Sequence, residues 1–156
     1  MKAFLVTLAL LGLVPSAHGD APARELASGE YVSSLWDCHL SLYAITQFVI
    51  VGLDKTNPGD LKALAPGLTR RVQRFEDTVR ILRQVTPKDV RLQPLARVFV
   101  RQYRDLAAWS KDLARSFESG DRAAVLHEVA SGSYLLRDLR LSWFVLEENL
   151  GKSSEG

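Results

Sequence analysis

The chain has 156 residues, of which 47% are hydrophobic and 24% are charged, and its formal net charge is +2. This composition is typical of a soluble globular protein, and it excludes a disordered chain, which would have too few apolar residues to form a core. The length predicts one domain that is large enough to bury a core of its own.

The first residues have the pattern of a secretory signal peptide. Lys2 precedes an apolar run over residues 3–14, and Pro15 ends that run. Ala17 and Gly19 then place small residues where a signal peptidase requires them, and the run is too short to span a bilayer comfortably. We therefore expect residues 1–19 to be a cleaved signal peptide and the protein to be periplasmic or secreted. The alternative is that this run is the first helix of the fold.

Cys38 is the only cysteine, so no disulfide can form within the chain. In an oxidising compartment, a single cysteine is either a buried thiol or a partner in an intermolecular bridge. Because Cys38 lies on an apolar stripe and a free cysteine behaves as a small hydrophobe, we expect the buried thiol.

Residues 20–30 are mixed in character and predict a loose leader, and the first helix follows over about residues 31–53. Apolar residues recur there at the three-four spacing of one helix face. They are Leu35, Cys38, Leu42, Ile45, Val49 and Leu53. A turn over residues 54–60, which contains Asn57-Pro58-Gly59, ends this helix.

A second helix is predicted over residues 61–82. Its stripe is Leu61, Leu64, Leu68, Val72, Phe75, Val79 and Leu82. Pro66 interrupts the pattern early, so the helix either kinks at this proline or begins there.

The third helix has a start signal at Thr86, with Pro87 at the first helical position and Asp89 three residues after the cap. Its stripe is Leu92, Leu95, Phe99, Tyr103, Leu106, Trp109, Leu113 and Phe117. Pro94 falls inside the first turns, which leaves open a start about one turn later.

Ser119-Gly120-Asp121 breaks the third helix and caps a fourth. The fourth stripe is Val125, Val129, Gly132, Leu136, Leu139, Trp143, Leu146 and Leu150. Residues 151–156 form a polar tail that we expect to be flexible.

Together the four segments predict an all-α domain over residues 31–150. No segment shows the sustained alternation of a strand. Long helices with short connections favour antiparallel neighbours, so we expect a four-helix up-down-up-down bundle. The alternative is two helical hairpins that a partner completes.

The first predicted helix carries a second apolar seam, made of Trp36, Leu40, Tyr43 and Ile50. This seam is centred well over 100° from the core stripe, at about 100° per residue. Surplus apolar surface of this kind indicates a dimer face or a docking site for another helix. The alternative is a central helix that contacts three neighbours.

Basic residues are concentrated in one segment. Residues 70–104 contain ten basic and three acidic residues, a local charge of +7, whereas the rest of the chain after residue 19 has a charge of −6. Because arginine donates paired hydrogen bonds to phosphate and carboxylate groups, the segment predicts a surface that binds anionic lipid or another polyanion. The candidate residues are Arg70, Arg74, Arg97, Arg101 and Arg104. The alternative is a solvated face whose arginines pair with acids on the first and fourth helices, and export argues against nucleic acid as a partner.

Gly132 lies at a core position of the fourth helix. Glycine inside a helix costs about 1 kcal/mol relative to alanine, so its small size is usually exploited. We expect a large neighbour such as Trp109 or Tyr43 to fill the space, and the alternative is a ligand pocket.

Donors for a metal or cofactor are sparse. Only His39 and His127 remain after residue 19. His39 has Leu35 and Tyr43 one turn away, neither of which is a catalytic partner, and His127 has Ser131 one turn on, but the adjacent Glu128 points about 100° away from it. We expect each histidine to be structural, with no metal, no cofactor and no catalysis. The leading hypothesis is an exported, non-enzymatic protein-interaction module that associates with a protein partner or with itself through the first helix. A binder of anionic envelope components is the second hypothesis, and a small-molecule carrier near Gly132 is a weaker third.

Overall fold

The computed structural model describes residues 23–55 and 60–153. The predicted signal peptide and the Asn57-Pro58-Gly59 turn lie outside these ranges. The elements in chain order are β1 (Arg24–Leu26), α1 (Ser28–Lys55), α2 (Leu61–Leu82), β2 (Val85–Pro87), α3 (Gln93–Ser119) and α4 (Arg122–Ser153).

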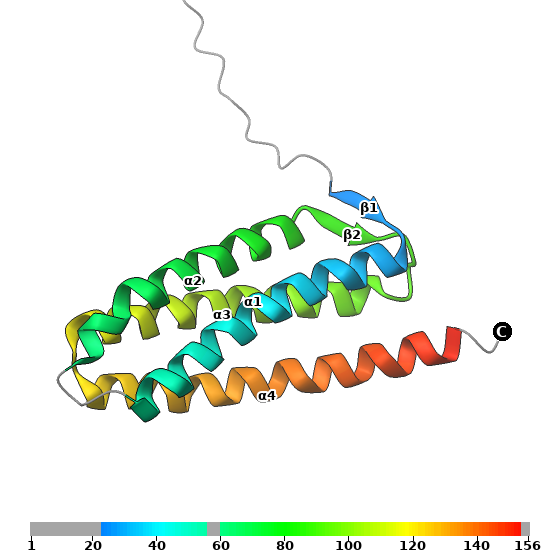
Figure 1. Cartoon of the computed structure of the whole chain (residues 1–156). Helices are drawn as coiled ribbons and strands as arrows, with labels where there is room; N and C mark the ends of the chain where they lie inside the picture. The colour runs from blue at the N-terminus through cyan, green and yellow to red at the C-terminus, as the bar shows by residue number, and fades with distance from the viewer. Residues whose placement is uncertain (1–22, 56–59, 154–156) are drawn as a thin grey trace, which may run out of the picture.

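The four helices pack in the order of the chain, as the all-α prediction requires. α1 packs on α2, α2 on α3, and α3 on α4. Successive helices run in opposite directions (Figure 1). In the described part of the chain, however, the backbones of α1 and α4 hardly approach each other. The first and last helices therefore leave an edge of the fold open.

The predicted stripes form the core of the fold. Most of their members are buried in one cluster, and the others lie partly buried against it. Among the described residues, the fully buried aromatic side chains are Tyr31 of α1, Phe75 of α2, and Phe99, Tyr103 and Phe117 of α3, so the first three helices supply the aromatic centre of the core.

Two short strands correct the expectation that the leader is loose and that the chain has no strands. β1 pairs in parallel with β2, and Glu25 lies opposite Thr86. The amide of Arg24 donates to the carbonyl of Gln84 at 2.8 Å, and the amide of Lys88 donates to Leu26 at 2.8 Å. Because each strand has only three residues, neither is long enough to show the alternation by which strands are recognised. α1 then begins at Ser28, three residues before the predicted start.

The helix start predicted at Thr86 is also wrong. Thr86 and Pro87 belong to β2, and α3 begins only at Gln93, with Pro94 in its first turn. Pro94 therefore starts its helix, because a proline in the first turn replaces an amide that would have no helical partner. The Asp89 carboxylate accepts from the amide of Arg91 at 3.0 Å in the connection between β2 and α3.

Of the two alternatives for Pro66, a helix start at this proline is excluded, because α2 begins at Leu61 and continues through Pro66. The cap predicted at Asp121 is confirmed: its carboxylate accepts from the amide of Ala123 at 2.9 Å. Gly120 precedes this cap with a φ of 73°, a conformation that glycine adopts without strain. α4 runs to Ser153, three residues into the predicted tail.

Trp109 fills the space over Gly132. A Cβ at Gly132 would lie 2.6 Å from Trp109 Nε1 and still closer to other indole atoms. The indole N–H donates to the carbonyl of Glu128 at 2.7 Å, which fixes the ring against α4. The packing explanation of Gly132 is thus confirmed, and the indole occupies the position that a ligand beside this glycine would need.

Candidate functional site

The open edge begins where α1, α3 and α4 are joined by hydrogen bonds. The Tyr103 hydroxyl of α3 donates to the carbonyl of Leu35 in α1 at 3.3 Å. It also accepts from Trp143 Nε1 of α4 at 3.2 Å. Burial raises the pKa of Tyr103, so the phenol stays protonated and keeps its role as a donor. These two bonds connect the first and last helices through a residue of the third.

Aromatic rings of α1 and α4 contact each other beside these hydrogen bonds. The ring centroids of Trp36 and Trp143 are 4.9 Å apart. His39 lies beside both rings, at 5.4 Å from Trp36 and 5.5 Å from Trp143. Its Nδ1 is buried without a hydrogen-bond partner, and burial lowers the pKa of His39 from its ordinary 6.5. The uncharged form of His39 is therefore favoured in this contact.

An apolar groove separates α1 and α4 beside this contact. We call it the α1–α4 groove, and its volume is about 570 Å³. It is lined by Trp36, His39, Leu42, Tyr43, Thr46 and Ile50 of α1 and by Leu136, Leu139, Arg140, Trp143 and Glu147 of α4. No other element of the described chain contributes to its lining, so the groove is a property of the open edge.

All four residues of the second seam are exposed. Trp36 is 48% exposed, Leu40 57%, Tyr43 55% and Ile50 60%. Trp36, Tyr43 and Ile50 line the α1–α4 groove, whereas Leu40 lines a second groove between α1 and α2. The described part of the chain therefore leaves most of the surface of the seam uncovered, although α1 has α2 on one side.

α4 adds apolar surface that the stripe pattern does not reveal. Tyr134, Leu141, Phe144 and Val145 are all exposed, Leu141 and Phe144 each by 60%. A signal for them exists in the sequence, because residues 134, 141 and 145 recur at helical spacing on the face away from the core stripe. The exposed apolar surface of the fold is thus concentrated on its first and last helices.

The length and composition of α1 over Ser28–Asp54 would also let it cross a membrane, although a core helix passes the same test. Only 28% of its most apolar window is buried. The buried share includes Leu35, Cys38 and Ile45, which belong to the common core. The excess of apolar residues in α1 therefore comes from its two stripes, of which only one is used within the chain.

Cys38 is a buried free thiol, as predicted. Burial is the main cause that raises its pKa to about 12, and the neighbouring Asp37 adds to the effect. The thiol consequently stays protonated at neutral pH and packs as a small apolar group.

The five candidate arginines fall into two separate grooves. Arg70 and Arg74 line the groove between α1 and α2. Arg97, Arg101 and Arg104 line another groove, beside β2 on the surface of α3, with a volume of about 350 Å³. Although α2 and α3 are neighbours, the five arginine side chains are thus not brought together in one place.

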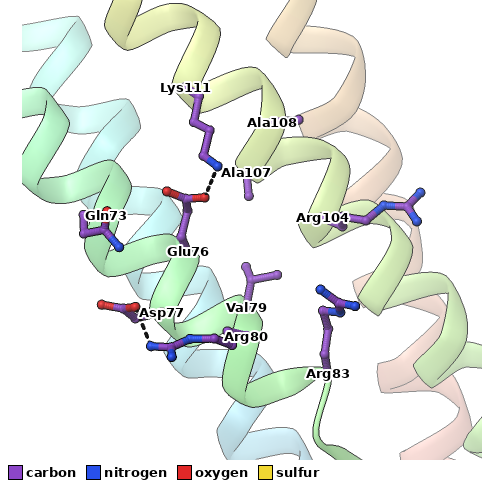
Figure 2. A pocket seen from close by; sticks show the side chains of 10 residues that line it. All are labelled: Gln73, Glu76, Asp77, Val79, Arg80, Arg83, Arg104, Ala107, Ala108 and Lys111. Carbon is purple, nitrogen blue, oxygen red and sulfur yellow. Dashed lines mark hydrogen bonds and ion pairs between the residues drawn. The ribbon is translucent and has the colours of Figure 1, made fainter. Parts of the chain in front are cut away.

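A further hollow lies between α2 and α3 and contains both signs of charge. Glu76 pairs with Lys111 across the two helices, and Asp77 pairs with Arg80 at 2.7 Å (Figure 2). Arg83, which directly follows α2, and Arg104 of α3 line the same hollow on the side away from these carboxylates. The acids of the basic segment therefore have partners of their own.

Several arginines of the basic segment form no ion pair with the described residues. They are Arg70, Arg74, Arg83, Arg97 and Arg101. Arg104 pairs only with the adjacent Asp105, at 3.1 Å. None of these six arginines pairs with an acid of α1 or α4 among the described residues, which is the pairing that a neutralised face would need.

Among the described residues, no group of three or more histidine, cysteine or acidic side chains is placed to hold a metal ion. His39 lies in the aromatic contact described above, and His127 is exposed on α4. The structure thus does not bring the two histidines into a common cluster with acids.

Comparison with known proteins adds no relative: no protein-family model, no curated protein and no solved structure matches this chain.

Proposed function

We propose that the protein is an exported, non-enzymatic interaction module that associates with a second copy of itself through the open edge between α1 and α4. The observation that carries this proposal is the α1–α4 groove together with the exposed seam of α1. Monomeric soluble proteins rarely expose a continuous apolar surface of this kind. Tryptophan and tyrosine, which flank the groove at Trp36, Tyr43 and Trp143, are the residues that most often dominate binding energy at interfaces.

A second copy is the partner that the sequence of the edge favours. The groove is formed by two helices and is lined mostly by apolar side chains, and α4 supplies an exposed apolar helix face of matching character. In a two-fold dimer, each copy contributes the same surface to the interface. The exposed face of α4 in each copy can therefore cover the groove of the other.

Tyr43→Asp and Ile50→Asp, which both change residues that line the α1–α4 groove, test this proposal. Each places a carboxylate in an interface that would otherwise exclude water, so we expect either change to raise the dimer dissociation constant at least about tenfold. Light scattering or sedimentation equilibrium over a range of micromolar concentrations measures it. Ile81→Asp is the matched control, because Ile81 is similarly exposed but lies on α2. A wild-type protein that stays monomeric over this range rejects self-association.

The arginines support a second candidate function, the binding of anionic lipid head groups. Arg97, Arg101 and Arg104 line one groove, and Arg97 and Arg101 have no ion-pair partner among the described residues. Guanidinium groups in this position can donate paired hydrogen bonds to phosphate without first leaving an internal partner.

This second candidate predicts binding to vesicles of anionic phospholipid that weakens steeply with added salt. We expect the double change Arg97→Gln and Arg101→Gln to reduce retention several-fold, because two charges leave one groove. The matched double change Arg70→Gln and Arg74→Gln removes the same charge from the other groove and shows which of the two matters. Retention of the protein on the vesicles that is absent or independent of salt rejects lipid binding. Binding to a soluble polyphosphate but not to the vesicles would assign the groove to a free polyanion.

A further inference from the structure

The groove-lining face of α4 carries two unpaired charges of opposite sign, Arg140 and Glu147. Both line the α1–α4 groove, and both side chains belong to exposed residues. Neither takes part in any of the ion pairs formed within the described chain. They are seven residues apart, so they lie on the same face of α4, about 10 Å from each other along the helix axis.

The midpoint between these two residues falls between Trp143 and Phe144. If α4 packs against α4 of a second copy in the opposite direction, with a two-fold axis at this midpoint, Arg140 of each copy lies opposite Glu147 of the other. The axis then passes through the aromatic part of the helix, where Phe144 is 60% exposed. One arrangement would therefore cover the exposed ring and form two ion pairs between Arg140 and Glu147, one on each side of the axis.

The middle of α1 offers no such pair. Between Glu30 and Asp54, α1 carries three acidic residues and no lysine or arginine, and its one lysine, Lys55, is the last residue of the helix. Opposite charges that meet across an interface fix the register of two copies, and only α4 carries such a pair beside its exposed ring. The charge pattern thus distinguishes the two helices of the open edge and favours α4 at the two-fold axis. The seam of α1 is then covered by the second copy beside this axis.

We infer that two copies of this chain associate about a two-fold axis between Trp143 and Phe144, with α4 antiparallel to α4 and Arg140 paired with Glu147 of the second copy. This inference rests on the proposed self-association and adds its geometry. It names the contact that selects a second copy of this chain over an unrelated apolar helix, because only a copy presents the same two charges in reverse order.

Charge reversal tests the inference. In Arg140→Glu, two acids oppose each other at both ends of the contact, and in Glu147→Arg two bases do so. Each single variant should therefore raise the dimer dissociation constant about tenfold or more at low salt. An equimolar mixture of the two variants should form a heterodimer with near wild-type affinity, because each acid again meets a base. The double variant Arg140→Glu, Glu147→Arg should associate with itself for the same reason.

Arg122→Glu is the matched control. It makes the same change of charge on α4, but in the inferred register residue 122 lies beyond the end of α4 of the second copy and should not affect the dissociation constant. Circular dichroism of each variant checks that the helices are retained. If Tyr43→Asp breaks the dimer while the charge reversals leave it unchanged, self-association stands and the inferred axis is wrong. If the wild-type chain is monomeric at all concentrations tested, both proposals fail.

Discussion

Gly132→Ala should destabilise the protein by about 1–2 kcal/mol, although alanine is the better helix former. Helix propensity alone would stabilise α4 by about 1 kcal/mol. The added methyl group, however, would overlap the Trp109 indole, whose Nε1 lies 2.6 Å from the position of the new Cβ. Forcing extra atoms into a packed core costs about 1–3 kcal/mol, and the indole cannot move without straining its bond to Glu128. The steric effect outweighs propensity.

Chemical denaturation of Gly132→Ala and wild-type protein measures this difference in the free energy of unfolding. Gly29→Ala is the control, because a Cβ there has nothing within 4 Å. It should be neutral or slightly stabilising. Adding Trp109→Phe to Gly132→Ala should recover part of the loss, since the smaller ring leaves room for the methyl group, and the two changes should not be additive. A Gly132→Ala protein more stable than the wild type would show that Trp109 does not fill this space.

Trp143→Ala should cost about 2–3 kcal/mol of unfolding free energy, because this large aromatic side chain is partly buried against the core. Trp143 packs edge-on against Phe99 of α3, with ring centroids 5.4 Å apart, and donates to Tyr103. The change therefore removes an aromatic contact from the core and leaves the Tyr103 hydroxyl without one of its partners.

Trp36→Ala removes the same type of side chain from the other side of the aromatic contact and is the comparison for this prediction. Trp36 is 48% exposed and makes no hydrogen bond through its side chain to the described residues, so its loss should cost less than about 1 kcal/mol. Thermal or chemical unfolding distinguishes the two variants. Equal losses would contradict the assignment of Trp143 to the core and of Trp36 to the surface.

The core of this fold can be predicted from the sequence because each helix carries its own apolar period. Leu68, Phe75 and Leu82, for example, are buried as the spacing of α2 requires. The cap at Asp121 is equally local, since it depends on a short polar side chain beside a glycine. Features that are set by three or four neighbouring residues can therefore be predicted from the sequence, down to the individual residues.

The strands and the start of α3 were not predictable in this way. Thr86 and Pro87 have the local chemistry of a helix start, but residues 24–26, distant in the chain, pair with them and hold them extended. This pairing is a tertiary effect that does not appear in the hydrophobic periodicity of either segment. Each strand is also too short for its own pattern to outweigh the helix signal. Tertiary contact thus overrides a valid local preference at residue 86.

The candidate surface was found only in part. The exposed seam at Tyr43 and Ile50 follows from a second period on one helix, whereas the groove depends on how far α4 lies from α1. A bundle pattern predicts that the first and fourth helices close together. Nothing in the period of either helix distinguishes a closed edge from an open one. The division of the arginines between two grooves has the same origin, since it depends on the rotation of α2 and α3 about their axes.

The order of helix packing has a consequence for local unfolding. α2 and α3 are each flanked by two helices, whereas α4 packs mainly on α3 alone. Detaching α4 would break that helix–helix contact and the Trp143 bond while leaving α1, α2 and α3 assembled around Phe75 and Tyr103. Such a segment can open as a unit at a lower free energy than the whole domain. Amide protons of α4 would then exchange with solvent before those of α2, and a protease would find its first site in the last helix.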